Sequence, residues 1–541
     1  MTRRLLGLAA LAALPVLALV AFFVVPVAAM VSLGLEGDGG LAGTLEVLTR
    51  ERTHRVLLFT LATAAAGTLV SVVLGLPTAH VLHRTSLPLR RPVRAALLVP
   101  FVLPTVVVGV AFRQLLGEGG PLGFLGLDGT PVAIVLGLVF FNVAVVIRVV
   151  GSAWESLDPR PAQAAATLGA APATVFRTIT LPALRPAIVS AATVVFLFCA
   201  TAFGIVLTLG GARYATVETE IYLLTVQLFD LQAAAALSLL QLVVVCGLLL
   251  AARRTRTVAP TARRPVPPRR PDRSDAVPLA ATLVLLLYVA LPVAALVTGS
   301  LRVEGSWSLA NYEALTTTGD QQALLVPVTE ALLNSLRTAV DATWMSLLVG
   351  LMVALVVTRR SRSVTERRVR GVLDGFFMLP LGVSAVTLGF GFLIALDKPP
   401  LDLRDSPLLV PVAQALVALP LVVRILVPVL AGIDDRQRQA AASLGAGPLR
   451  ALATVDLPVL WRPLLAGAGF AFAASLGEFG ATSFLARDDA PTMPVVIFRL
   501  LGHPGEMNYG MALAASCVLA ATTALVMLLV ERLRVPSLGA F

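Results

Sequence analysis

Twelve apolar segments, each about as long as a membrane-spanning helix, constrain this chain more than any other feature of its sequence. They lie near 5–33, 56–82, 95–115, 131–152, 187–209, 231–252, 277–299, 335–358, 372–395, 407–430, 464–485 and 507–531. A helix needs roughly 20 residues to cross about 30 Å of hydrocarbon. Lipid offers no hydrogen-bond partner to an open strand edge, so spanning segments must be helices or closed barrels. The sequence therefore predicts an all-α polytopic membrane protein with about 12 transmembrane helices.

The composition supports a membrane protein and argues against a nucleic-acid binder. The 541 residues are 57% hydrophobic and 13% charged, whereas a soluble protein carries roughly 25% charged residues. The net charge of +11 reflects basic residues that gather on the cytoplasmic side of a membrane. The first apolar run is longer than the roughly 7–15 residues of a signal-peptide core. We therefore expect it to be a retained span.

The distribution of arginine between the loops predicts the orientation of the chain. Three strongly basic segments, 83–94, 253–273 and 359–370, lie on one side of the membrane if the N-terminus also lies there. The connecting segments on the opposite side are acidic or neutral, as 36–40 and 117–129 show. Because short cytoplasmic loops are enriched in Lys and Arg, we expect both termini to be cytoplasmic.

An internal repeat divides the chain into two parts of six spans each. The decapeptide QAAATLGAAP at 163–172 returns as QAAASLGAGP at 439–448, an offset of 276 residues. Because six is an even number, both copies have the same orientation, and the repeat is parallel. We predict a first half at 1–252, a basic Pro/Arg-rich cytoplasmic linker at 253–276 and a second half at 277–541.

The two decapeptides fall in cytoplasmic loops at 153–186 and 431–463, and the same local structure is predicted for both. An Asp is placed to N-cap a short helix. A Gly follows it at a position that suits left-handed geometry, and a second short helix begins at a Pro and ends before a Leu-Pro. The residues in these roles are Asp158, Gly169, Pro172 and Pro182 in the first loop and Asp434, Gly445, Pro448 and Pro458 in the second.

This pattern resembles the EAA loop of ABC importer permeases. The resemblance implies the type I permease fold of the bacterial plasma (inner) membrane, with each loop forming a coupling helix that docks on a separate ATP-binding subunit. It further implies two copies of that subunit on the cytoplasmic face and a substrate-binding protein on the extracytoplasmic face. Gln163 and Gln439 stand where the family usually has Glu. The coupling residues are Asp158, Gln163, Ala164, Ala165, Gly169, Pro182, Asp434, Gln439, Ala440, Ala441, Gly445 and Pro458.

Within that family the chain is most similar to the thiamine and ferric-iron importer group. The stretch 196–222 is similar to both subgroups, and 474–502 looks more like the thiamine permease. Thiamine is the favoured solute and ferric iron the alternative. A candidate translocation path comprises Glu478, Phe479, Gly480, Phe203 and Gly204. An acid at membrane depth is costly, so Glu478 is expected to face the path. Otherwise it lies hydrated near the outer mouth or bonds the backbone of its glycine-rich stretch.

The chain lacks the sequence signals of an enzyme. A Walker A loop needs a Lys on the phosphates, and the one Lys, Lys398, lies outside such a motif. The four histidines have no metal-ligand spacing, and the three cysteines lie in apolar runs. We therefore expect a transport subunit that binds no cofactor or metal itself, with ATP used by a partner. The remoter alternative is a gradient-driven secondary transporter, which would leave the paired loops unexplained.

Overall fold

The all-α fold class is confirmed by a computed structural model that describes residues 3–36, 40–88, 90–97, 99–211, 213–255, 268–359, 363–397 and 402–532. Lys398 and most of the basic linker lie outside these ranges. Within them, the only sheet is a hairpin of β1 (Arg302–Val303) and β2 (Ser306–Trp307). Ten helices in the described ranges are long and apolar enough to cross a membrane: Ala9–Glu36, Glu51–Arg84, Pro131–Ser156, Pro172–Ala200, Leu231–Leu250, Arg273–Ser300, Val328–Thr358, Leu409–Gly432, Leu449–Leu476 and Glu506–Val530.

The two remaining predicted spans, 95–115 and 372–395, are broken helices. In the first, α6 (Val99–Val102) and α7 (Thr105–Leu116) flank a break at Pro104, whose ring disfavours helix at the residue before it. In the second, α18 (Val364–Phe377) and α19 (Ala385–Ala395) flank a 3₁₀ turn, η7 (Leu379–Gly382). The Ser384 hydroxyl caps α19 by accepting a hydrogen bond from the Thr387 N–H at 3.1 Å. Both breaks therefore follow from local backbone chemistry.

The remaining elements are shorter segments that form part of these spans or connect them. They are α1 (Arg3–Leu19), η1 (Val20–Val24), α2 (Val25–Glu36), α3 (Gly40–Thr49), α5 (Arg90–Ala96), η2 (Gly123–Leu125), α9 (Arg160–Thr167), α10 (Pro172–Val175), η3 (Phe176–Thr180), α12 (Gly204–Gly210), α13 (Val217–Val226), η4 (Arg273–Asp275), α16 (Ala310–Glu313), η5 (Ala314–Thr316), η6 (Asp320–Gln322), α21 (Asp435–Ser443), α22 (Pro448–Ala451), η8 (Leu452–Asp456), α24 (Thr482–Leu485) and α25 (Met493–Gly502).

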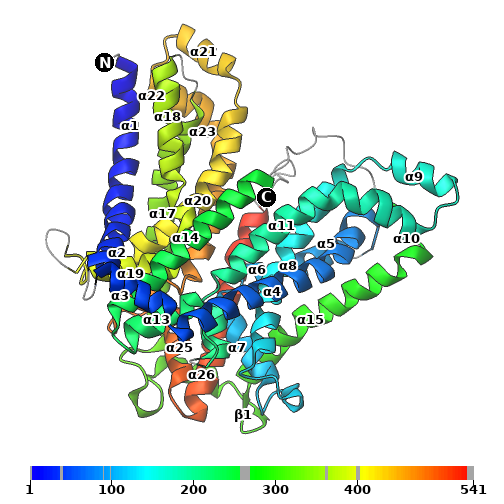
Figure 1. The fold of residues 1–541 in the computed structure, drawn as a ribbon, viewed down its shortest axis with the longest axis vertical. Helices are drawn as coiled ribbons and strands as arrows, with labels where there is room; N and C mark the ends of the chain where they lie inside the picture. Colours follow the sequence, from blue (N-terminus) through cyan, green and yellow to red (C-terminus); the bar gives the residue numbers. More distant parts are fainter. Residues whose placement is uncertain are drawn as a thin grey trace. The chain divides into compact units, whose positions relative to one another are not determined.

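The chain forms two compact units, and each is built from parts of the sequence on both sides of the linker. One unit contains the described residues within 1–46, 224–239 and 312–532, and the other contains those within 47–223 and 240–311. In the first unit, α1 runs alongside α17 (Val328–Thr358), and α2 packs on α19 (Figure 1). In the second unit, α15 (Ala276–Ser300) packs on α4 (Glu51–Arg84) and α7. The halves at 1–252 and 277–541 remain a prediction from the sequence repeat.

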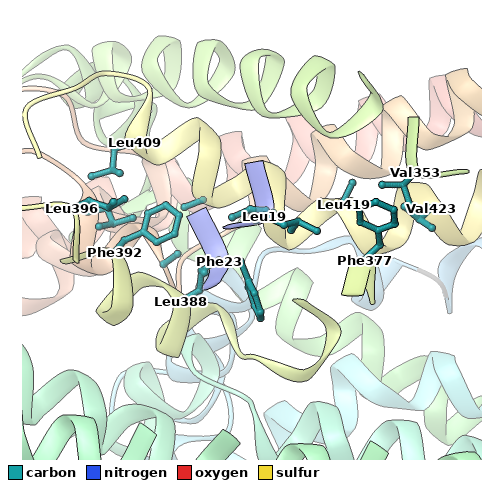
Figure 2. Packing of buried hydrophobic residues seen from close by; sticks show 14 of the residues in the cluster. Leu19, Phe23, Val353, Phe377, Leu388, Phe392, Leu396, Leu409, Leu419 and Val423 are labelled. Atoms are coloured by element: carbon teal, nitrogen blue, oxygen red, sulfur yellow. The ribbon is translucent and has the colours of Figure 1, made fainter. Parts of the chain in front are cut away.

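The core of the first unit shows how its N-terminal helix is held. Leu19 and Phe23 lie among Leu388 and Phe392 of α19 and Leu419 of α20 (Leu409–Gly432) (Figure 2). Lipid tails are as apolar as these side chains, so close packing rather than water exclusion holds helices together in a membrane. The packing of the first span against α19 and α20 therefore depends on how closely their side chains fit together.

One close helix crossing is repeated in the two units and is made possible by glycine. A Cβ on Gly75 of α4 would lie 2.8 Å from Cγ1 of Val146, which is on α8 (Pro131–Ser156). A Cβ on Gly350 of α17 would lie 2.6 Å from Cγ1 of Val422, on α20. Small residues at such crossings let helix backbones approach closely. Each unit therefore has the same tight contact between two of its spans.

Gly350→Leu is expected to reduce the amount of folded chain in the membrane several-fold. The added side chain must separate α17 from α20, and overpacking of this kind costs about 1–3 kcal/mol or more. Gly247→Leu is the matched control, because nothing lies within 4 Å of a Cβ built at Gly247. Quantitative immunoblotting and fluorescence-detected size exclusion would check this. Equal yields of the two variants would contradict a tight crossing.

Candidate coupling loops and translocation path

The first EAA loop (153–186) begins with the predicted capped helix and glycine turn. The Asp158 Oδ1 accepts a hydrogen bond from the Arg160 N–H at 3.0 Å, at the start of α9. At the other end, Gly169 has φ +83°. The N–H groups of Gly169 and Ala170 donate to the carbonyls of Ala166 and Ala165 at 3.0 and 3.1 Å. These are the bonds of a Schellman C-cap, which favours glycine because it has no Cβ.

The second EAA loop (431–463) repeats this geometry closely. The Asp434 Oδ1 accepts from the Arg436 N–H at 2.9 Å, at the start of α21. Gly445 has φ +82°, and its N–H donates to the Ala442 carbonyl at 3.0 Å. Gln163 and Gln439 are exposed on their helices, as are Ala164 and Ala440, while Ala165 and Ala441 are half-buried. The two loops thus present equivalent surfaces, whose residues are 276 positions apart in the sequence.

The prediction that the second short helix ends before Pro182 and Pro458 is wrong. Each helix continues through the Leu-Pro into the next span, as one helix over Pro172–Ala200 and one over Leu449–Leu476. A five-residue π turn precedes each Leu-Pro, and its last bond runs from the Leu181 N–H to the Phe176 carbonyl, or from Leu457 to Leu452. A π turn widens the helix locally and thereby accommodates a proline that breaks the normal hydrogen-bond ladder. Each loop is consequently continuous with a membrane helix.

Two leucines in these loops were missed by the sequence analysis. Leu168 and Leu444 directly precede the left-handed glycines, and each side chain is 88% exposed. Both lie in loops between predicted spans, where exposure to lipid does not explain them. Their presence at the same position of both decapeptides was the available signal.

The candidate path residues lie where the helices after the EAA loops break. In the second unit, α11 (Leu181–Ala200) ends shortly before Phe203, and α12 begins at Gly204. In the first unit, α23 (Leu457–Leu476) ends before Phe479 and Gly480, and α24 follows. Discontinuous helices of this kind commonly surround substrate sites in transporters. The structure therefore places the path candidates of each unit at equivalent breaks.

An aromatic pair accompanies each of these breaks. The rings of Phe203 and Tyr222 have centroids 5.4 Å apart at an interplanar angle of 65°. Those of Phe479 and Phe498, at the equivalent positions, are 5.5 Å apart at 54°. Tilted rings at these separations attract one another. The partners Tyr222 and Phe498 were not among the residues predicted from sequence.

Glycine also allows these breaks to touch the broken spans at 95–115 and 372–395. A Cβ on Gly204 would lie 2.4 Å from Oγ1 of Thr105, at the start of α7. A Cβ on Gly480 would lie 2.9 Å from Cβ of Ala385, at the start of α19. In each unit, two interrupted helices therefore meet at a glycine.

Glu478 is buried and binds the backbone of its own break. Its Oε1 accepts from the Ala481 N–H at 2.8 Å and its Oε2 from the Thr482 N–H at 3.0 Å. These donors lie at the start of α24, where a helix leaves its first N–H groups unsatisfied and favours negative charge. The equivalent residue of the first half is Ala202. Of the alternatives considered for Glu478, this geometry supports the backbone-bonding role.

Metal-binding side chains do not cluster in the described part of the chain. No group of three or more His, Cys, Asp or Glu residues in these ranges could hold a metal ion.

Comparison with known proteins agrees with this architecture. Residues 346–534 match the family described as binding-protein-dependent transport system inner membrane component. A molybdenum transport system permease protein of Mycobacterium tuberculosis is 38% identical over 213 residues, which cover 38% of this chain and 80% of that protein. Thiamine transport system permease proteins of Brucella abortus and Escherichia coli are each 29% identical. The Brucella match covers 88% of this chain and 87% of the relative, and the E. coli match covers 83% of each.

Repeated helical units with paired loops and interrupted membrane helices define a transport permease. The chain belongs to the family of binding-protein-dependent transport system inner membrane components. It is a multi-pass inner-membrane protein and the permease subunit of an ABC importer.

Proposed function

We propose that this chain holds both permease halves of an importer, at 1–252 and 277–541, and that two ATP-binding subunits dock on its EAA loops. The observation that carries the proposal is the pair of matched loops, each with a capped helix, a left-handed glycine and an exposed leucine. A two-fold set of surfaces fits a partner present in two copies. The chain itself has no Walker A sequence, so a partner must bind the nucleotide.

The continuous helices explain how such docking would drive transport. ATP binding would bring the two ATP-binding subunits together and move both loops. The helices over Pro172–Ala200 and Leu449–Leu476 would carry that motion to the breaks at Gly204 and Gly480. The transporter would then alternate between inward- and outward-facing states. The basic loops support an orientation with both termini and both EAA loops in the cytoplasm, and a binding protein would deliver the solute to the opposite face.

We propose thiamine as the solute. Permeases of thiamine transport systems align with most of this chain. Thiamine is an aromatic cation, and rings of the kind that attract cations lie at the break in each unit, Phe203 with Tyr222 and Phe479 with Phe498. Phe203, Tyr222 and Phe479 are buried here, so a solute would reach them only after the helices move. Glu478 would shape this path by fixing α24 and need not touch the solute.

Two measurements test these assignments. Mild-detergent purification of the chain from its native membranes should copurify an ATP-binding subunit, and its consistent absence would contradict docking on the EAA loops. Calorimetry on the cognate binding protein should show thiamine binding. Binding of ferric iron without thiamine would leave the assignment as an importer unchanged and would make ferric iron the solute.

Leu168→Asp and Leu444→Asp together are expected to reduce capture of the ATP-binding subunit by about tenfold or more. Each change places a charge where an apolar side chain is expected to enter a partner's groove, and such anchors dominate interface energies. Pull-down with a tagged permease would measure the loss. Leu309→Asp is the control, because Leu309 is 61% exposed and lies outside both EAA loops. Equal capture by all variants would place the dock elsewhere.

A further inference from the structure

A buried carboxylate ties the second EAA loop to its helices, and it has no counterpart in the first loop. Asp456 is fully buried at the end of the π turn η8, directly before the Leu-Pro. Its Oδ1 accepts a hydrogen bond from the Arg438 Nε at 2.8 Å. Its Oδ2 lies 3.5 Å from an Arg359 guanidinium nitrogen. The carboxylate therefore joins three segments: the coupling helix α21, the end of α17 and the start of α23.

Arg438 extends this connection to a fourth segment. Its guanidinium lies 3.0 Å from the Asp435 Oδ1 and donates to the Leu430 carbonyl, near the end of α20, at 3.5 Å. The Arg438 side chain is itself largely buried. A charge pair held out of water cannot be separated without leaving an uncompensated buried charge. The cluster of Arg359, Arg438 and Asp456 therefore resists movement of α21 relative to α17, α20 and α23.

The repeat shows that the first loop cannot form this cluster. The positions 276 residues before Arg438 and Asp456 hold Ala162 and Thr180, which carry no charge. The first loop instead makes an aromatic contact, in which Phe176 of its π turn stacks on Trp154 of α8 with centroids 6.3 Å apart. Stacked rings can slide while remaining in contact, whereas a directional hydrogen bond between Arg and Asp fixes geometry. Ion pairs also occur at the start of the first loop, where Glu155 pairs with His83, Arg90 and Arg94, but these pairs hold the end of α8 and not α9. The coupling helix of the second loop is thus held by a buried bond between Arg438 and Asp456, whereas the π turn of the first loop is held by stacked rings.

From this difference we infer that the cluster of Arg359, Arg438 and Asp456 couples the motion of the second EAA loop tightly to its membrane helices. The first EAA loop can move more freely relative to its own helices. The inference rests on the proposed coupling role of the loops. Asp456 is a positioning residue here: it acts through α21 and touches neither nucleotide nor solute. The two docking surfaces are nearly identical, but motion of the ATP-binding subunits would then be transmitted more rigidly to one unit than to the other.

The test is Asp456→Asn in the complete transporter, reconstituted with its ATP-binding subunits and binding protein in proteoliposomes. Asn keeps the shape and one acceptor but removes the charge. We expect solute uptake to fall about tenfold while ATP hydrolysis stays within about twofold, so that more ATP is consumed per solute. Thr180→Asn, the equivalent position of the first half, is the control and should leave that ratio unchanged. Asp456→Glu retains the charge and should recover part of the uptake.

Two outcomes would overturn the inference. A parallel fall in uptake and ATP hydrolysis would show that Asp456 only supports folding, and an equal rise in ATP consumed per solute in Thr180→Asn would show that the loops are equivalent. Arg438→Gln is the second variant if Asp456→Asn fails to accumulate, and the same ratio decides. Failure of the coupling role itself would be seen separately, as unchanged capture of the ATP-binding subunit by the Leu168 and Leu444 variants.

Discussion

Replacing Gly169 and Gly445 together with valine is expected to abolish transport while the chain still enters the membrane. Both glycines have φ near +80°, at +83° and +82°, a region where a β-branched residue is strongly strained. The cost is about 1–3 kcal/mol at each site, and the turn can relieve it by rotating the coupling helix away from its docking position. Solute uptake in proteoliposomes should fall to background. Each single variant should retain a measurable fraction.

Gly447→Ala is the control for this pair. It lies two residues after Gly445, nothing is within 4 Å of its Cβ position, and the first loop has Ala171 at the equivalent place. Its uptake should match that of the unchanged chain. Normal uptake by the double valine variant would remove the left-handed turns from the coupling mechanism.

Glu478→Leu is expected to produce the second large effect, on stability as well as on transport. The change deprives the N–H groups of Ala481 and Thr482 of their acceptors in a buried setting. Each unsatisfied donor costs about 1–3 kcal/mol, so the start of α24 should unfold locally. Thermal unfolding in detergent should shift down by several degrees, and uptake should fall more than tenfold.

Glu478→Gln separates the backbone role from a direct contact with solute. Its amide oxygen can satisfy one of the two donors, so its stability should lie between those of Glu478→Leu and the unchanged chain. Ser483→Ala is the matched control, because it removes a hydroxyl that donates to the Gly480 carbonyl at 2.8 Å and leaves both N–H bonds intact. Unchanged stability of Glu478→Gln with strongly weakened uptake would instead indicate that the charge faces the solute.

Local features of the EAA loops could be read from the sequence because they depend on neighbouring residues. Asp158 and Asp434 cap the helices that follow them, and Gly169 and Gly445 adopt positive φ. A cap or a glycine turn needs only the few residues around it. The repeat then extended each inference to its second copy.

Features that depend on distant residues could not be obtained in this way. Arg359 and Asp456 are 97 positions apart in the sequence, and only packing brings their charges within 3.5 Å. The continuation of the helices through Pro182 and Pro458 required π turns, whose stability is set by the spans that they join. Leu168 and Leu444 were visible in the decapeptides, but their exposure was not.

The sequence by itself determined that the chain crosses a membrane many times, that it repeats a polar decapeptide after 276 residues and that the two copies cap and turn alike. These properties follow from the length of the apolar segments, from the repetition of one decapeptide and from the preference of single residues for caps and turns. Only the tertiary structure decided that each compact unit takes helices from both sides of the linker, and that the second coupling helix is held by a buried ion cluster where the first loop has stacked rings. Those outcomes depend on contacts between segments far apart in the chain, whose free energies no local pattern encodes.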